Sequence, residues 1–295
     1  MGRLDNKVAV ITGAGSGVGR EHALLLASEG AQVVVNDIGE AADETVASIN
    51  ANGGEAVSHV GSVSDWSTGE DLVATALEAF GDLHILINNA GILRDAMSFS
   101  MNEQEFDEVI AVHLKGHFVC ARAAAIYWRN QSKGGKNSAR RMVHTTSESG
   151  LFGGPAQSNY ASAKGGILTL SLTLGRELSK YGVTTNVVAP RARTGLTDYI
   201  QSMAAPESKD QFDVYDPANV SPFVVWLCTD EAQDVNGQAF IVGGSGVWWM
   251  RSWSHINHIK LEGQKLSISQ IGELKAELFN GEETGIPAFA APKFG

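Results

Sequence analysis

The run Gly13–Gly19 (GAGSGVG) separates two segments of different periodicity, and this combination restricts the fold more than any other feature of the chain. The preceding run Lys7–Thr12 (KVAVIT) is apolar and rich in β-branched residues, which is typical of a buried strand. The segment that follows has a helical pattern through about Glu29. Glycines let the backbone approach a pyrophosphate closely, and the N-terminus of the next helix supplies N–H donors and the positive end of its dipole. Together these features predict a dinucleotide-binding loop.

The rest of the chain alternates between strand-like and helical segments, an order that implies a parallel sheet with helices on both faces. Strands are expected at 32–37, 55–60, 83–88, 141–146 and 182–189, with a last strand at 239–242. Helices are expected at 42–52, 65–80, 102–127 with an interruption at Gly116, 158–180 and 217–229. We therefore predict an α/β fold: a Rossmann-like doubly wound parallel sheet, forming a single domain with a C-terminal extension.

Asp37 ends the second predicted strand, about 20 residues past the glycine loop. An acidic residue at that place accepts hydrogen bonds from the ribose hydroxyls of adenosine. A 2′-phosphate would meet the negative charge, and no arginine follows directly, so the sequence favours NAD over NADP. The alternative is that Asp37 caps the next helix. Asn88–Gly91 (NNAG) follows another strand, at the edge where such folds bind ligands.

Tyr160 and Lys164 lie four residues apart at the start of a predicted helix, on one face, and Ser147 ends the strand before it. An ammonium beside a phenol favours tyrosinate and lowers the pKa of the tyrosine. A serine hydroxyl from another segment can hydrogen-bond the same reacting oxygen. The three side chains describe a proton-transfer site for an alcohol and its carbonyl. The alternative is a surface tyrosine and lysine on an amphipathic helix.

The composition is that of a large globular protein, with 43% hydrophobic residues in a chain of 295. The formal net charge of −11 argues against nonspecific nucleic-acid binding. Because neither a signal-peptide pattern nor an apolar run of about 18 residues occurs, we expect a cytoplasmic protein without a membrane span. Cys120 and Cys228 lie in apolar helical patterns and are expected to be buried thiols.

Two loops have open roles. Residues 132–141 (SKGGKNSARR) form a basic, glycine-bearing loop, which is either a solvated connection or a feature that attracts an anionic substrate. Residues 190–217 contain few apolar side chains and predict a long loop. Long loops at a binding edge often act as lids.

The composition changes from about Val247, where VWWMRSWSHINHI holds three of the six tryptophans. We expect residues 1–247 to form the NAD-binding and catalytic domain, and residues 248–295 to pack on it or on a partner subunit. The tryptophans either close the substrate pocket or serve packing. His255 and His258 lie three residues apart, but no nearby carboxylate or cysteine completes a ligand set. We expect these histidines at the surface and no metal site.

The motifs TGAGSGVG, Asp37, NNAG and Ser…YxxxK, in this order and spacing over residues 5 to 247, resemble the short-chain dehydrogenase/reductase family. More narrowly, NDIG at 36–39, NNAGILRD at 88–95, VHLKGHF at 112–118 and NVVAP at 186–190 resemble one subgroup. This is the (3R)-hydroxyacyl-CoA dehydrogenase domain of the peroxisomal multifunctional β-oxidation enzyme, with its stand-alone bacterial relatives. The resemblance implies an NAD-dependent oxidoreductase and a homodimer or homotetramer.

The resemblance also implies residue roles. Tyr160 is the expected general acid/base, Lys164 is expected to lower its pKa and bind the nicotinamide ribose, and Ser147 is expected to orient the substrate oxygen. The implied cofactor-binding residues, besides Tyr160 and Lys164, are Gly13, Ser16, Gly17, Val18, Gly19, Asp37, Ser62, Val63, Asn89, Gly91 and Thr194.

Three positions depart from the family pattern. His113 stands where many members have a catalytic asparagine, and it either preserves a proton relay through its main-chain carbonyl or only packs. Arg191 follows Pro190 where the family has glycine, which leaves the loop conformation open. Ser62 stands where the family has aspartate, so the adenine contact is weaker or differently made.

The predicted function is the NAD-dependent interconversion of a secondary alcohol and a ketone, with a 3-hydroxyacyl-CoA as the first substrate hypothesis. A hydroxysteroid or another hydrophobic secondary alcohol is the alternative. An NAD-binding protein without turnover is a further hypothesis, but it would not need Ser147, Tyr160 and Lys164 together.

Overall fold

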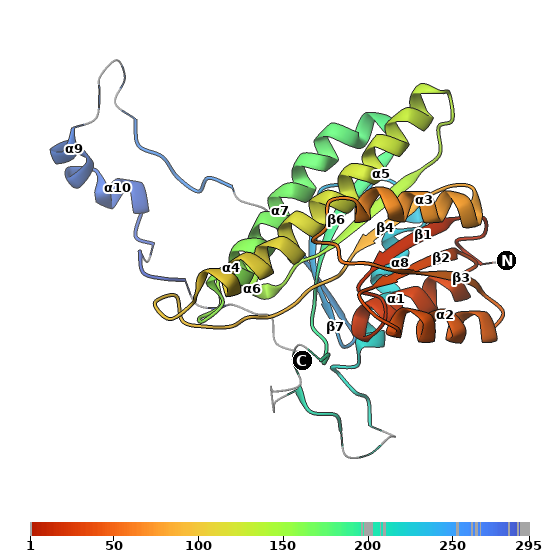
Figure 1. Cartoon of the computed structure of the whole chain (residues 1–295). Helices are drawn as coiled ribbons and strands as arrows, with labels where there is room; N and C mark the ends of the chain where they lie inside the picture. Colours follow the sequence, from red (N-terminus) through yellow and green to blue (C-terminus); the bar gives the residue numbers. More distant parts are fainter. Residues whose placement is uncertain are drawn as a thin grey trace.

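A computed structural model describes residues 2–195, 197, 203–206, 208, 211–251, 254–260, 262, 265, 267–282, 284–287 and 289. Its centre is an eight-stranded sheet of order β3-β2-β1-β4-β5-β6-β7-β8, in which β1 to β7 are parallel (Figure 1). The strands are β1 Val8–Thr12, β2 Gln32–Asp37, β3 Glu55–Val60, β4 Ile85–Asn88, β5 Arg140–Thr145, β6 Val183–Pro190, β7 Ala239–Gly243 and β8 Gly246–Met250. The order reverses beside β1, as in doubly wound folds.

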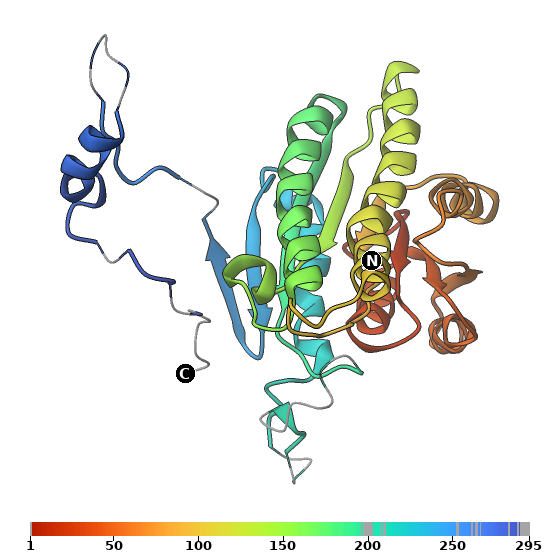
Figure 2. The ribbon, with the colours of Figure 1, turned by 60° about the vertical axis from the view of Figure 1, so that its left-hand side comes forward.

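Helices cover both faces of the sheet, as Figures 1 and 2 show. One face carries α1 Gly17–Ser28, α2 Ala41–Ala51 and α8 Ser221–Leu227. The other carries α3 Thr68–Phe80, α4 Glu103–Ile110, α5 Gly116–Lys133 and α7 Ser158–Leu178. The short helix α6 Glu148–Phe152 follows β5, and 3₁₀ turns lie at Ser179–Tyr181, Pro217–Asn219 and Asp230–Ala232. The predicted fold class is confirmed.

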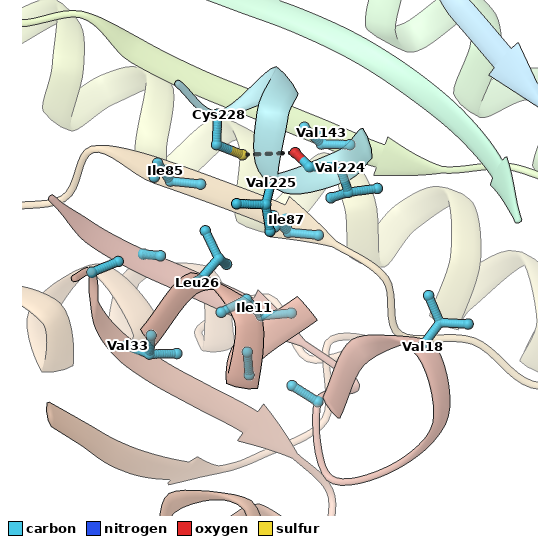
Figure 3. Close-up of a cluster of buried hydrophobic side chains, with 14 of the residues drawn as sticks. Ile11, Val18, Leu26, Val33, Ile85, Ile87, Val143, Val224, Val225 and Cys228 are labelled. Atoms are coloured by element: carbon cyan, nitrogen blue, oxygen red, sulfur yellow. Dashed lines mark hydrogen bonds between the residues drawn. The ribbon is translucent and has the colours of Figure 1, made fainter. Parts of the chain in front are cut away.

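Alternation along each strand divides the core into two clusters. In β1, Ala9 and Ile11 join the cluster under α1, α2 and α8, whereas Val8 and Val10 join the cluster under α3, α5 and α7. Figure 3 shows the first cluster, where Cys228 donates its S–H to the Val224 carbonyl at 3.3 Å. Both cysteines are buried and unbridged, and burial raises the pKa of each to about 12, so the predicted buried thiols are confirmed.

The long helical region at 102–127 is confirmed in type but runs further and is less regular. It consists of α4, a π-helix at Ala111–Lys115 and α5, and Gly116 begins α5. Among the described residues, Glu103–Lys133 is the one helical run whose length and composition would also suit a membrane span. Half of that window is buried, and Cys120 and Trp128 pack in the core, so the run serves here as a core helix.

The prediction that 239–242 is the last strand is wrong. Strand β8 follows β7 and pairs with it antiparallel, with Gly243 opposite Gly246. Gly244, at φ 55°, occupies the first of the two loop positions, where hairpin turns need a positive φ. The tryptophan run that we expected to begin the extension therefore continues the sheet across residue 247.

The described part of the tail forms α9 Ile268–Glu273 and α10 Lys275–Phe279, which stand away from the sheet in Figures 1 and 2. Most of its described side chains are exposed to solvent, with Ile268 90% exposed. His255 and His258 are exposed, as expected, while Ser252 and Trp253 lie outside the described residues. The domain boundary at 247 and the packing of the tail remain predictions.

Candidate active site

A cavity of about 840 Å³ lies at the carboxyl ends of the parallel strands, among the loops that follow β1, β2, β4, β5 and β6. Most residues that the sequence singled out line it: Gly13, Ser16, Gly17, Val18, Asp37, Ser62, Val63, Asn89, Gly91, Ser147, Tyr160 and Thr194. Gly19, His113 and Lys164 are buried outside this lining. The cofactor residues and the Ser147–Tyr160 pair therefore share one cavity.

The glycine turn approaches its neighbours too closely for side chains. Gly13 has φ 62°, and a Cβ there would lie 2.6 Å from the Ala90 Cα. A Cβ on Gly19 would lie 2.2 Å from the Gly13 carbonyl oxygen. Ser16, the N-cap of α1, makes no side-chain capping bond, so the N–H donors of the first turn are left for another acceptor. A helix start of this kind fits an anionic diphosphate.

Asp37 lies at the end of β2 and lines the cavity. Tyr160 also lines it, but from α7, which follows β5, and β1 and β4 stand between β2 and β5 in the sheet. Its carboxylate accepts hydrogen bonds from the Gly15 N–H at 2.9 Å and the Ile38 N–H at 2.7 Å. The N-cap of α2 is Glu40, so the helix-capping alternative for Asp37 is wrong. Two backbone donors thus hold the carboxylate at the cavity wall, where a ribose would bind.

Asn89 braces the glycine turn from β4. Its side-chain Nδ2 donates to the Gly13 carbonyl at 3.0 Å, and its backbone N–H donates to Thr12 Oγ1 at 3.0 Å. On the adenine side, the Ser62 hydroxyl lies 2.8 Å from the Ser64 hydroxyl, so it already has a partner. Val63 is buried there. Ser62, which stands where the family has an aspartate, and Val63 therefore both line this part of the cavity.

Ser147 and Tyr160 reach the cavity from different elements. Ser147 is the N-cap of α6, and its Oγ accepts a hydrogen bond from the Ser149 N–H at 3.2 Å. With that lone pair used, the serine proton is directed elsewhere and can be donated to a substrate oxygen. Tyr160 lies in the first turn of α7, where Asn159 accepts from its backbone N–H at 2.7 Å.

Lys164 lies one turn beyond Tyr160 and is almost fully buried, with 2% exposure. Its Nζ lies 5.6 Å from the centre of the Tyr160 ring and donates to the Thr145 carbonyl at 2.7 Å. Burial lowers the pKa of Lys164 from 10.5 to about 7. The alternative of a surface lysine beside the tyrosine is therefore wrong, because Lys164 lies in the interior next to the Tyr160 ring. Ser147 lines the same cavity as Tyr160, and the catalytic roles of the three side chains stay predictions.

His113 supports the site from within the π-helix. Its Nε2 donates to the Ile92 carbonyl at 2.7 Å, and its ring meets the Tyr160 ring edge-on with centres 5.1 Å apart. Burial lowers the pKa of His113 to about 3, so the ring is neutral. A Cβ on Gly91 would lie 2.4 Å from this ring, which explains the glycine. The side chain packs behind Tyr160; the relay through its carbonyl remains a prediction.

Sequence reasoning missed several residues that shape the site. Asn159 Nδ2 donates to the carbonyls of Arg94 and Glu105 at 2.9 and 3.0 Å, which fixes the start of α7. Glu148 and Arg191 line the cavity as an ion pair. Glu148 follows Ser147 and Arg191 follows Pro190 in the sequence. The ion pair between them joins distant parts of the chain, so no short stretch of sequence indicates it.

An aromatic pair marks one part of the cavity wall. Phe152, at the end of α6, meets Phe289 of the tail edge-on with ring centres 5.5 Å apart, and Phe289 lines the cavity. Trp248 and Trp249 do not line it, so the hypothesis of pocket-closing tryptophans is wrong for these two. Of the loop 190–217, Thr194, Thr197 and Met203 line the cavity, whereas residues 196, 198–202, 207, 209 and 210 lie outside the described residues.

The basic loop at 132–141 does not serve the cavity. It leads into the amino end of β5, and the cavity lies at the carboxyl end of that six-residue strand. Arg140 pairs with Asp82 at 2.7 Å, and Arg141 donates to the Thr229 carbonyl at 3.2 Å. Attraction of an anionic substrate by the arginines of this loop is therefore the wrong alternative, because both are buried and paired at the amino end of β5.

Comparison with known proteins gives the family. The model of the short chain dehydrogenase family matches residues 7–206, which include the glycine turn, Asp37, Ser147, Tyr160 and Lys164. The chain belongs to the short-chain dehydrogenase family. Members of this family are oxidoreductases that use a nicotinamide cofactor, and the cavity of this short-chain dehydrogenase has the glycine cradle that such a cofactor requires.

Several relatives of this short-chain dehydrogenase carry informative names. The hydroxyacyl-CoA dehydrogenase ChsB1 of Mycobacterium tuberculosis is 45% identical over 252 residues, covering 83% of this chain and 79% of that protein. The peroxisomal multifunctional enzyme type 2 of Mus musculus is 39% identical over 259 residues, but these are only 33% of its length. A crystal structure of a short chain dehydrogenase from Mycobacterium avium covers 98% of this chain and is itself fully covered, with 44% identity and a TM-score of 0.88.

Within the described residues, no group of three or more histidine, cysteine, aspartate or glutamate side chains is placed to hold a metal ion.

Proposed function

We propose that this short-chain dehydrogenase interconverts a secondary alcohol and a ketone with NAD, and that its substrate is a 3-hydroxyacyl-CoA. One observation carries this proposal: Ser147 and Tyr160 line the cavity that also contains the glycine turn, and the Lys164 Nζ lies 5.6 Å from the centre of the Tyr160 ring. A protein that bound a nucleotide without turnover would not need Ser147, Tyr160 and Lys164 together.

The preference for NAD rests on Asp37. Its carboxylate is fixed by two backbone N–H groups at the cavity wall. A ribose with both hydroxyls free can donate to it, whereas a 2′-phosphate would be repelled. Asp37 and the turn Gly13–Gly19 would hold the adenosine and diphosphate portions. The redox chemistry would be supplied by bound NAD, as the acceptor of the hydride that the alcohol loses.

In the oxidising direction, the Tyr160 oxygen removes the hydroxyl proton of the substrate as tyrosinate. The Ser147 hydroxyl, whose oxygen already accepts from the Ser149 N–H, donates its proton to the same substrate oxygen. Lys164 lies under the phenol ring, and the protonated form of this lysine favours the deprotonated form of the phenol. In the reducing direction Tyr160 returns the proton. His113, packed edge-on against Tyr160, restrains the ring while these protons move.

The substrate class is supported by the names of relatives and by apolar residues that line the cavity. ChsB1 is named a hydroxyacyl-CoA dehydrogenase, and the residues that line this cavity include the apolar side chains of Leu93, Pro155, Met203 and Phe289. An acyl chain or another hydrophobic body would remove these side chains from water. The homo-oligomeric state and the cytoplasmic location stay predictions from the sequence.

Steady-state kinetics on a matched panel test the proposal. The panel contains 3-hydroxyacyl-CoA thioesters of increasing chain length, a hydroxysteroid and simple secondary alcohols, each with NAD and with NADP. We expect the highest kcat/KM with NAD and a hydroxyacyl-CoA. A hydroxysteroid preference would replace the substrate hypothesis, whereas no nicotinamide reduction with any alcohol would refute the dehydrogenase function itself.

A further inference from the structure

An ion pair spans the cavity wall directly beside the catalytic serine. Glu148 is the first residue of α6 and follows Ser147, and Arg191 follows the end of β6. Arg191 Nε lies 3.2 Å from one carboxylate oxygen of Glu148, and its Nη2 binds the other. The side chain of Arg191 is only 11% exposed and that of Glu148 only 18%. Two parallel bonds fix the direction of the carboxylate as well as its position.

Arg191 is held on its other sides by the β7–β8 hairpin. Its guanidinium carbon lies 5.4 Å from the centre of the Trp248 ring, and its backbone N–H donates to the Val242 carbonyl at 2.7 Å. A Cβ on Gly243 would lie 2.5 Å from the Arg191 carbonyl oxygen, so the hairpin backbone presses directly on residue 191. The tryptophan run thus reaches the active site through Arg191 and not by lining the cavity.

The backbone at position 191 does not require the glycine that the family has there. Among the described residues, positive φ outside glycine occurs at Asn6, Ala156 and Asn280, so Arg191 has an ordinary conformation. The arginine side chain is therefore tolerated without strain, and its contacts reach from β8 to the N-terminus of α6. The loop conformation that the sequence left open at Arg191 is therefore an ordinary one.

We propose that Arg191 is a positioning residue for Ser147, an inference that rests on the dehydrogenase function proposed above. The ion pair fixes Glu148, and with it the first turn of the five-residue helix that Ser147 caps. Arg191 also neutralises a carboxylate that would otherwise stand unpaired beside the oxygen on which negative charge develops. Removing one partner of a largely buried pair leaves the other charge uncompensated. Both effects act on turnover, and neither involves the Asp37 end of the cavity.

The test uses Arg191→Met, Glu148→Gln and the double variant, with the best alcohol substrate of the panel and kcat expressed per NADH-binding site. We expect Arg191→Met to lower kcat by about 100-fold, the cost of a small misplacement of a reacting group, with the NADH dissociation constant unchanged. Adding Glu148→Gln removes the unpaired charge, so the double variant should be more active than Arg191→Met. Lysine cannot form the two parallel bonds that arginine makes, so the kcat of Arg191→Lys should lie between that of Arg191→Met and that of the wild type.

The chain contains a matched control. Arg122 pairs with Glu70 at 3.3 Å and lies over the Trp66 ring at 5.3 Å, an arrangement of the same three residue types that lines no part of the cavity. Arg122→Met should leave kcat per site at the wild-type value. Thermal unfolding of every variant separates folding from positioning, because a merely structural Arg191 would lower Tm without lowering kcat per NADH site.

The outcomes separate the two proposals. Wild-type protein without turnover on any alcohol refutes the dehydrogenase function. Wild-type turnover combined with unchanged kcat in Arg191→Met, or with equal losses in Arg191→Met and Arg122→Met, refutes the positioning role alone. A double variant no more active than Arg191→Met also counts against it.

Discussion

Replacing Lys164 with methionine should stabilise the protein near neutral pH while removing its activity. Lys164 is 2% exposed, and burial lowers its pKa from 10.5 to about 7. The unfolded chain therefore binds this proton more tightly than the folded protein does. Stability must increase with pH between about 7 and 10.5, because in that window the unfolded state carries the extra proton.

The magnitude follows from the two pKa values. At pH 7 the buried lysine costs roughly 4 kcal/mol relative to a side chain that does not titrate, and at pH 9 roughly 2 kcal/mol. Methionine has a similar length and no charge, but the Thr145 carbonyl loses the hydrogen bond that Lys164 donates at 2.7 Å. That loss costs about 1 kcal/mol at every pH. Lys164→Met should thus be more stable than wild type by about 3 kcal/mol at pH 7, and this advantage should shrink towards pH 9.

The assay is urea unfolding followed by circular dichroism at pH 7, 8 and 9, without cofactor, at one protein concentration and one ionic strength. Lys180→Met is the control, because Lys180 also lies over a tyrosine ring, that of Tyr181 at 5.2 Å, but is exposed. Its unfolding free energy should differ little from wild type at any of the three values. A Lys164→Met advantage that stays constant from pH 7 to 9 would refute the burial argument, even if activity were lost.

Three further predictions concern turnover and specificity. Tyr160→Phe should lower kcat by about 10²–10⁴ with NADH affinity nearly intact, and a variant with more than about a tenth of wild-type kcat would contradict the acid/base role. Asp37→Asn keeps an acceptor for the Gly15 N–H but removes the charge, so the ratio of kcat/KM with NADP to that with NAD should rise about tenfold; an unchanged ratio would mean that Asp37 does not select the cofactor. Phe289→Ala opens one apolar wall, so KM should rise for long-chain thioesters more than for short ones, and an equal change for both would place Phe289 outside the acyl subsite.

The sheet could be predicted because each buried strand is marked by apolar runs and each crossover by helical periodicity. β2 and β3 have the expected bounds, and β1, β4, β5 and β6 differ by one or two residues at an end. β8 was missed because its tryptophans, the exposed Trp249 and the partly buried Trp248, were interpreted as a change of composition and not as a strand. The π-helix at Ala111–Lys115 was not predicted either; within it, His113 packs against Gly91 and Tyr160, which lie far away in the chain.

That the glycine turn and Asp37 line one cavity could be predicted from the sequence. The parts of this site are local: a glycine turn between one strand and one helix, and an acid at the end of the next strand. Each can be recognised in a short window, because the geometry that it serves is formed by adjacent residues. Asn89 is the partial exception, since it was expected to face the cofactor and its amide is occupied by the Gly13 carbonyl.

The substrate end could not be predicted in this way, because its walls are made by residues far apart in the chain. Glu148 and Arg191 are separated by 43 residues, and Phe152 meets Phe289 from the tail. Such contacts depend on how β6, the β7–β8 hairpin and α6 pack, and this is set by the whole sheet. The same division has a functional consequence: substitutions at Arg191 or Phe289 can alter turnover or substrate choice without disturbing the glycine turn or Asp37.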